Sequence, residues 1–96
     1  MTQFPEINAA YYARIMRDFL AGSISTGQYQ RAIFDAAKVR STLTEEESRI
    51  VGAAYRDADD YDAEIRLPYT IEELELRRRV ASLLEQFRDV GANAGH

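Results

Sequence analysis

The sequence contains no cysteine and no tryptophan among its 96 residues. Without cysteine, the chain can form neither a disulfide scaffold nor a thiolate zinc site, and it has no cysteine nucleophile. Its single histidine is His96, the last residue, which argues against a catalytic or metal site built around histidine. We therefore expect no cofactor, no bound metal and no enzymatic activity.

Long apolar runs and an excess of basic residues are also missing. No apolar run approaches the roughly 18 residues that a membrane-spanning helix needs, and residues 1–6 lack the basic start of a secretory signal. Twelve basic against 16 acidic residues give a net charge of −4, whereas binding to nucleic acid or to an anionic membrane needs a basic face. We expect one soluble, cytoplasmic domain that binds neither nucleic acid nor membrane.

Four segments show the spacing of apolar residues that is typical of amphipathic helices. We expect helices at about residues 6–21, 26–40, 45–62 and 71–90, followed by a flexible tail at 91–96. In chain order, the residues expected to face the core are Tyr12, Ile15, Met16, Phe19 and Leu20; Tyr29, Ala32, Ile33, Ala36 and Ala37; Ile50, Val51, Ala54, Tyr55, Ala58, Tyr61 and Ile65; and Leu76, Val80, Leu83, Leu84 and Phe87.

Signals for helix ends support these boundaries. A capping box pairs a Ser or Thr at the N-cap with a Glu or Gln three residues later. The boxes expected here are Ser25 with Gln28, Thr44 with Glu47, and Thr70 with Glu73, and the hydrophobic staples are Ile24 with Tyr29 and Tyr69 with Leu74. Gly22 and Gly91 are expected to end the first and last helices.

The sequence shows no alternating pattern that would indicate β-strands. Short connections between helices favour antiparallel neighbours. The fold class that we predict is therefore all-α, an antiparallel four-helix bundle.

Acidic residues are concentrated in one stretch of the chain. The net charge is +2 over residues 1–40, −5 over 41–66 and −1 over 67–96. Like charges three or four residues apart repel, and carboxylates near a helix C-terminus oppose the helix dipole. A local breach of stability rules in an otherwise consistent sequence points to function. The residues concerned are Asp57, Asp59, Asp60, Asp62 and Glu64.

Simpler interpretations of these residues remain open. A charge run is usually a solvated helix end. A calcium loop begun at Asp60 would need Gly and Glu where the chain has Ile65 and Ile71, so that interpretation fails. A hydrolase with paired carboxylates would need a cleft that so small a bundle seldom offers. Tyr61 lies within the run, where it is either a core residue or an interface anchor.

Other charged and aromatic residues are better explained by structure. The arginines at 77–79 follow Glu73 and Glu75 at the spacing of stabilising helix pairs, so a self-paired helix surface is favoured over a phosphate site. Tyr12, Tyr29 and Tyr55 lie on the apolar stripes, and we expect each ring in the core with its hydroxyl at the rim.

The layout resembles the colicin D immunity protein family. The matching elements are FLAGSIS at residues 19–25, AYRDADDYD at 54–62, ELR at 75–77 and VASLLEQF at 80–87, so the resemblance covers residues 12–88. It implies an antiparallel four-helix bundle that binds the C-terminal nuclease domain of a bacteriocin and covers its active site. The colicin D toxin itself cleaves transfer RNA in the anticodon loop.

The resemblance also implies which residues bind the toxin. Family members use acidic side chains at the end of the third helix and just after it, in place of RNA phosphates. Matching the aromatic pair Tyr55 and Tyr61 carries these roles onto Asp59, Asp62 and Glu64. Asp57 and Asp60 are their neighbours. The chain departs at Asp59 from one immunity protein of the family, which has a glutamate there, and it carries a different loop at 66–69, so we expect a different cognate toxin.

The function that we predict is a bacterial immunity protein whose acidic patch masks the basic active site of a toxic nuclease. The toxin would be a tRNase of the colicin D type or a contact-dependent inhibition toxin. A non-catalytic helical adaptor is the first alternative, and a carboxylate metal-binding bundle is the second. A weak homodimer through a leftover apolar strip also stays open.

Overall fold

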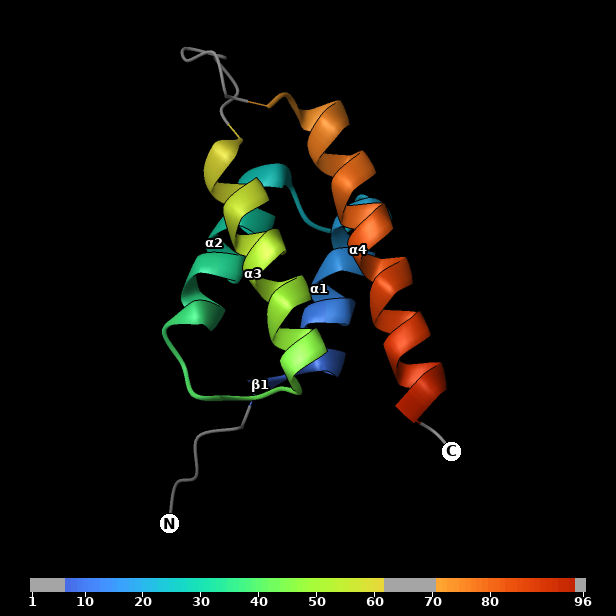
Figure 1. Ribbon diagram of the computed structural model, residues 1–96. Helices are drawn as coiled ribbons and strands as arrows, with labels where there is room; N and C mark the ends of the chain where they lie inside the picture. Colours follow the sequence, from blue (N-terminus) through green and yellow to red (C-terminus); the bar gives the residue numbers. More distant parts are fainter. Residues whose placement is uncertain (1–6, 62–70, 95–96) are drawn as a thin grey trace.

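A computed structural model describes residues 7–61 and 71–94 of the chain. The described part is mostly helical, with four helices and two very short strands (Figure 1). In chain order the elements are β1 (Ile7–Asn8), α1 (Ala9–Leu20), α2 (Thr26–Ala37), β2 (Ser41–Thr42), α3 (Glu45–Asp60) and α4 (Glu73–Ala94). The fold is all-α, as the sequence predicts. None of the described helices is long and apolar enough to cross a membrane.

Two of the predicted capping boxes are present. Ser25 accepts a hydrogen bond from the amide of Gln28, whose side chain accepts one from the amide of Ser25. Thr44 and Glu47 make the same reciprocal pair at the start of α3. Each box satisfies backbone N–H groups that have no partner within the helix, so both starts lie where the sequence places them.

The first three helices are shorter than predicted. Helix α1 begins at Ala9 rather than at residue 6, because the Asn8 side chain accepts from the Tyr11 amide and serves as the N-cap. Helix α2 ends at Ala37 rather than at residue 40, because the chain then enters β2, which pairs in parallel with β1. Two-residue strands are too short to produce an alternating pattern, so the sequence does not reveal them.

The fourth helix is displaced towards the C-terminus relative to the prediction. It begins at Glu73 instead of residue 71, because Ile71 forms a β-bridge with Tyr61. The start predicted at Ile71 is therefore two residues too early. The capping box of Thr70 with Glu73 and the staple residue Tyr69 depend on positions that lie outside the described residues. Leu74, the expected staple partner of Tyr69, is 64% exposed.

Gly91 does not end the fourth helix, which continues to Ala94. A glycine inside a helix costs only about 1 kcal/mol relative to alanine, so it stops a helix only where another conformation is more favourable. Residues 91–94 are therefore helical rather than the expected flexible tail, and residues 95–96 lie outside the description. Gly22, in contrast, has φ +81°, the left-handed conformation expected after the end of α1.

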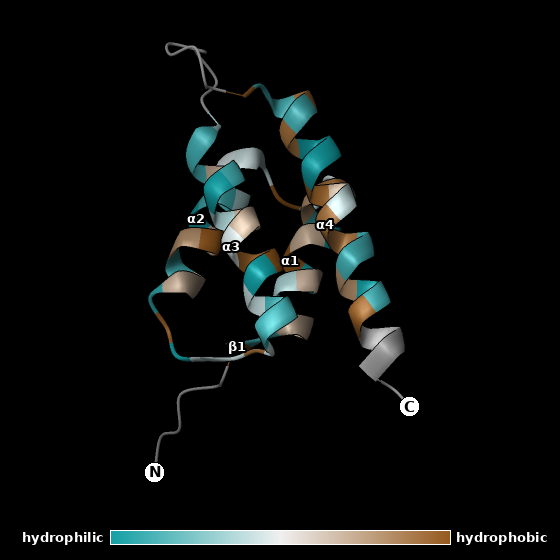
Figure 2. Cartoon of the chain, in the orientation of Figure 1, coloured by the Kyte–Doolittle hydropathy of each residue, from teal (hydrophilic) through white to brown (hydrophobic). Residues whose placement is uncertain are grey.

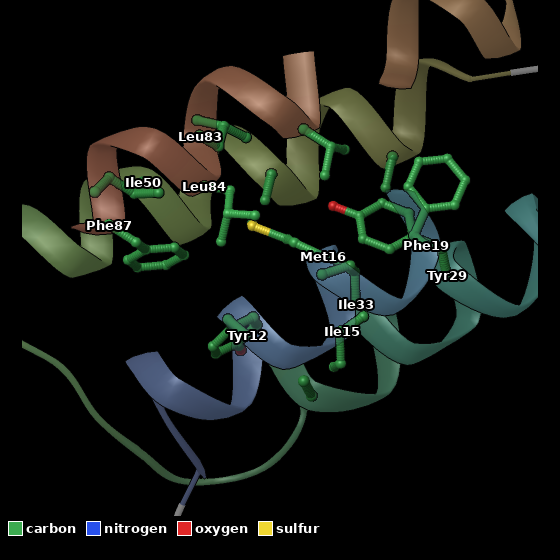
Figure 3. Close-up of a cluster of buried hydrophobic side chains, with 14 of the residues drawn as sticks. Tyr12, Ile15, Met16, Phe19, Tyr29, Ile33, Ile50, Leu83, Leu84 and Phe87 are labelled. Carbon is green, nitrogen blue, oxygen red and sulfur yellow. The ribbon is translucent and has the colours of Figure 1, made fainter. Parts of the chain in front are cut away.

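The core lies where the four helices meet. Helix α1 packs on α2 and α4, and α3 also packs on α2 and α4. Figure 2 shows hydrophobic colours on the inward sides of the helices, and Figure 3 shows part of the cluster between them. Its buried members are Ile7, Tyr12, Ile15, Met16, Phe19, Tyr29, Ile33, Ala36, Ile50, Ala54, Ala58, Ile71, Leu76, Val80, Leu83, Leu84 and Phe87.

Most core predictions are confirmed, with three informative exceptions. Ala37 is exposed, because α2 ends there. Tyr55 is 43% exposed instead of buried, and its ring contacts Phe34 with centroids 5.2 Å apart. Tyr29 is fully buried, and its hydroxyl is enclosed rather than lying at the rim, with no hydrogen-bond partner among the residues that the structure describes. Ile65 lies outside the described residues.

Candidate functional site

The candidate site is the acidic end of α3, defined here as Asp57, Asp59 and Asp60. The last turn of α3 carries no basic residue. Figure 2 shows hydrophilic residues at this end of the helix. The helix ends at Asp60 rather than at residue 62, and Tyr61 has extended backbone angles. Asp62 and Glu64, which were also predicted to bind the toxin, lie outside the described residues.

Asp57 is directed towards α4 and forms an ion pair with Arg79. The distance from Arg79 Nη1 to Asp57 Oδ1 is 3.1 Å, and the Asp57 side chain is 16% exposed. Arg79 Nε lies 3.0 Å from Glu75 Oε2, so one guanidinium bridges two carboxylates. Hydrogen bonds to Glu75 and Asp57 raise the pKa of Arg79. Asp57 is thus partly neutralised inside the protein, which reduces its capacity to attract a partner.

Asp59 and Asp60 are placed differently from Asp57. Asp59 is exposed and makes no ion pair with another described residue. Asp60 is half-buried, and its backbone carbonyl accepts a hydrogen bond of 3.1 Å from the Ile71 amide. Asp59 is therefore the carboxylate of the acidic end that is most available to a partner.

A glutamine from α2 fixes the end of α3. Gln30 Nε2 donates to the carbonyl of Ala58 at 2.8 Å and to that of Tyr61 at 3.3 Å. The last carbonyl groups of a helix have no partner within it, so this amide replaces a C-terminal capping residue. The contact spans about thirty positions of the chain, and a lone polar residue in the second helix gives no sequence signal for it.

Tyr61 connects the acidic end to the start of α4. It is half-buried, packs against the core and forms an isolated parallel bridge with Ile71. Such a side chain contributes to positioning the helix end, and part of it is exposed directly after Asp60 in the chain. The core and interface interpretations of Tyr61 are therefore compatible.

Polar contacts also tie α4 to α1 and α2 beside this site. The Thr26 hydroxyl donates to the Glu73 carboxylate, and Arg77 Nη1 donates to the carbonyl of Phe19 at 3.0 Å. The Arg77 guanidinium lies 4.5 Å from the centroid of the Phe19 ring, a cation–π contact. The predicted pairs are confirmed as well: Glu73 with Arg77 at 3.7 Å and Glu75 with Arg79 at 3.0 Å.

The buried Tyr29 lies close to the same network. Its ring stacks on Phe19 with centroids 4.5 Å apart, as Figure 3 shows. Burial raises the pKa of the Tyr29 hydroxyl, and the Asp57 carboxylate adds to this shift. Both effects disfavour a phenolate, so the Tyr29 hydroxyl stays protonated at neutral pH.

The described residues show no arrangement suited to metal binding. Among residues 7–61 and 71–94, no three carboxylate or histidine side chains are grouped closely enough to hold an ion. The carboxylates of the acidic end point in different directions, Asp57 towards Arg79 and Asp59 towards solvent. This arrangement can attract and pair with cationic groups of another molecule.

Comparison with protein-family models, with curated proteins and with solved structures gives no match for this chain. The resemblance to colicin D immunity proteins therefore depends on the short elements at residues 19–25, 54–62, 75–77 and 80–87.

Proposed function

We propose that this protein is a bacterial immunity protein that binds a cognate toxic nuclease domain and masks its basic active site. The observation that carries the proposal is the exposed Asp59 on a helix end that two neighbouring helices hold in place. Gln30 of α2 caps the end, and Arg79 of α4 anchors Asp57 one turn before it. No basic side chain in the last turn of α3 offsets the charge.

A nuclease active site attracts phosphates and is therefore basic. Carboxylates on a rigid support speed the encounter with such a site and add to its specificity. Rigidity matters because less conformational entropy is then lost on binding. In this proposal Asp59 makes the first contact and Asp60 supports it. Asp62 and Glu64 are assigned by the family resemblance.

The finer arrangement that we propose is an antiparallel four-helix bundle. It is supported by the packing of each helix on two others and by the reversal of chain direction between successive helices in Figure 1. In this proposal the protein acts in the cytoplasm, where it meets its toxin, and it acts by binding alone, without catalysis, cofactor, nucleic acid or membrane.

The test is to replace Asp59 and Asp60 by asparagine and to measure binding. The proposal requires a basic cognate toxin, and the probe is the purified C-terminal domain of that toxin, titrated by calorimetry. We expect the double variant to bind at least about tenfold more weakly, about 1.4 kcal/mol. The double variant should also protect cells that express the toxin domain less well than the wild type does.

The matched control is Glu45→Gln with Glu46→Gln, which removes the same charge from the opposite end of α3, where both residues are exposed. We expect the control to bind within about twofold of the wild type. Equal weakening by both pairs would indicate only long-range attraction. Unchanged binding by the Asp59 and Asp60 variant would show that the assigned site is wrong, and no binding by the wild type would refute the immunity function.

A non-catalytic helical adaptor is the second candidate. The observation in its favour is the exposure of large apolar side chains, Leu74 at 64% and Tyr11 at 42%. An adaptor would bind its partner equally well after the change at Asp59 and Asp60. The calorimetric experiment therefore separates the two candidates.

A further inference from the structure

The outer face of α2 and α3 carries two adjacent rows of residues. On α3, Val51, Tyr55 and Asp59 follow one another at intervals of four, so they share one side of the helix. On α2, Arg31, Phe34 and Lys38 line one surface hollow. The rows meet where the rings of Phe34 and Tyr55 touch, at 5.2 Å and an angle of 59°. Tyr55 leaves 43% of its surface uncovered there.

The hollow beside Phe34 is a shallow, open depression of the surface. Its volume is about 440 Å³, and it is lined by Gly27, Gln30, Arg31, Phe34, Asp35 and Lys38. A Cβ atom at Gly27 would meet no other atom within 4 Å, so this part of the hollow is open. The α2–α3 face therefore has both an aromatic projection, Tyr55, and a recess beside an aromatic ring.

The two rows differ in charge. Arg31 makes no ion pair with another described residue, and Lys38 lies 3.9 Å from Asp35 with both side chains largely in solvent. The α3 row ends instead in the carboxylate of Asp59, which pairs with no cation in residues 7–61 and 71–94. The surface that complements this mixed pattern is the same surface turned around a two-fold axis.

We propose that the α2–α3 face is a homodimer interface in which the α2 row of each copy packs on the α3 row of the other. Tyr55 of one copy enters the hollow beside Phe34 of the partner subunit. Asp59 then faces Arg31 of the partner subunit. A two-fold axis parallel to the helices makes both contacts twice, because the interface is isologous.

The heights of the two rows agree with this pairing. Gln30 bonds the carbonyl of Ala58, and Phe34 touches Tyr55, so α2 residues near 30 lie level with α3 residues near 58. A rotation about an axis parallel to the helices keeps each residue at its height. Arg31 and Asp59 of different copies are thus brought to about the same level. The dimer and the proposed nuclease complex both use Asp59, so one copy cannot form both at the same time.

The first test is sedimentation velocity on the full chain from about 10 µM to about 1 mM, the range of a weak dimer. We expect the wild type to shift from monomer to dimer over this range, and Tyr55→Ser to raise the dissociation constant at least about tenfold. The control is Tyr11→Ser, since Tyr11 is equally exposed, at 42%, but lies on α1; it should leave the constant within about twofold.

The second test exchanges charges. Arg31→Glu alone and Asp59→Arg alone should each weaken the dimer, because like charges then face each other across the interface. The two changes together should restore it to within about threefold of the wild type. Circular dichroism on each variant checks that it folds, as expected for exposed positions.

Three results would overturn the proposal. The first is a wild type that stays monomeric at every concentration, which would leave the face to a different partner. The second is a dimer that Tyr55→Ser does not weaken, and the third is a charge exchange without restoration. Because a nuclease takes no part in these experiments, their failure is separate from failure of the immunity function.

Discussion

Arg79 of α4 lies 3.1 Å from Asp57 of α3 and, through its Nε, 3.0 Å from Glu75 of its own helix. The sequence predicts the contact with Glu75, whose spacing of four is that of a helix pair, but not the contact with Asp57. The contact with Asp57 means that one carboxylate of the acidic end stabilises the fold.

Replacing Arg79 by leucine should therefore destabilise the protein. The change leaves Asp57 largely buried and without its cation. We expect the free energy of unfolding to fall by about 1–2 kcal/mol, which is less than the loss for a fully buried ion pair. Urea denaturation measures it. The control is Arg78→Leu, since Arg78 is 74% exposed and pairs with Glu75 at 3.3 Å; it should cost less than about 0.5 kcal/mol. Equal losses would mean that the contact with Asp57 contributes nothing.

Gln30→Leu tests the cap on α3. The change removes the donor to the carbonyls of Ala58 and Tyr61, and we expect a loss of about 1–2 kcal/mol. Hydrogen exchange should also become faster in the last turn of α3, while its first turns keep their protection. Gln86→Leu is the control, because Gln86 is exposed and bonds only Ser82, at 3.5 Å. Unchanged exchange after Gln30→Leu would contradict the assigned role.

Tyr29→Phe removes a buried hydroxyl that has no partner. Because this group is desolvated without a hydrogen bond in return, we expect the variant to be as stable as the wild type or up to about 1 kcal/mol more stable. Chemical denaturation at neutral pH measures the difference. A loss above about 1 kcal/mol would mean that the hydroxyl has a partner, such as a buried water.

The same substitution should alter the response to alkali. The pKa of Tyr29 is raised in the folded state from its ordinary value of 10.0, so the folded protein disfavours the phenolate. The stability due to this shift is fully present below about pH 10 and is lost as the pH rises through 10 towards the folded-state pKa. Tyr29→Phe should therefore lose less stability than the wild type between pH 9 and 11. Burial also raises the pKa of Tyr12, so part of this loss of stability at high pH remains in both the wild type and the variant.

Two glycines should respond to alanine with opposite signs. Gly22 has φ +81°, which an alanine adopts at a cost of about 1 kcal/mol, so Gly22→Ala should destabilise the protein. Gly52 lies inside α3, and a Cβ there meets nothing within 4 Å, so Gly52→Ala should stabilise it by about 0.5–1 kcal/mol. Thermal denaturation distinguishes the two changes. The same sign for both would contradict the backbone explanation.

The sequence by itself determined the helices and most of the core. Apolar spacing depends on the period of the helix, and a capping box lies within four residues, so both are local features that a sequence contains. This is why Phe19, Ile33 and Leu84 are buried as predicted and why α2 and α3 begin at the expected residues. The acidic character of the end of α3 is equally a property of the sequence.

Only the tertiary structure decided which polar residues of the site meet. Arg79 is 22 positions from Asp57, and Thr26 is 47 positions from Glu73, so no local pattern relates them. The start of α4 also depends on a long-range contact. The bridge between Tyr61 and Ile71 keeps residue 71 outside the helix, which the sequence predicts to begin there. Long-range contacts depend on how helices pack against one another. They therefore determine that Asp57 supports the fold, whereas Asp59 is exposed and makes no ion pair within the described part of the chain.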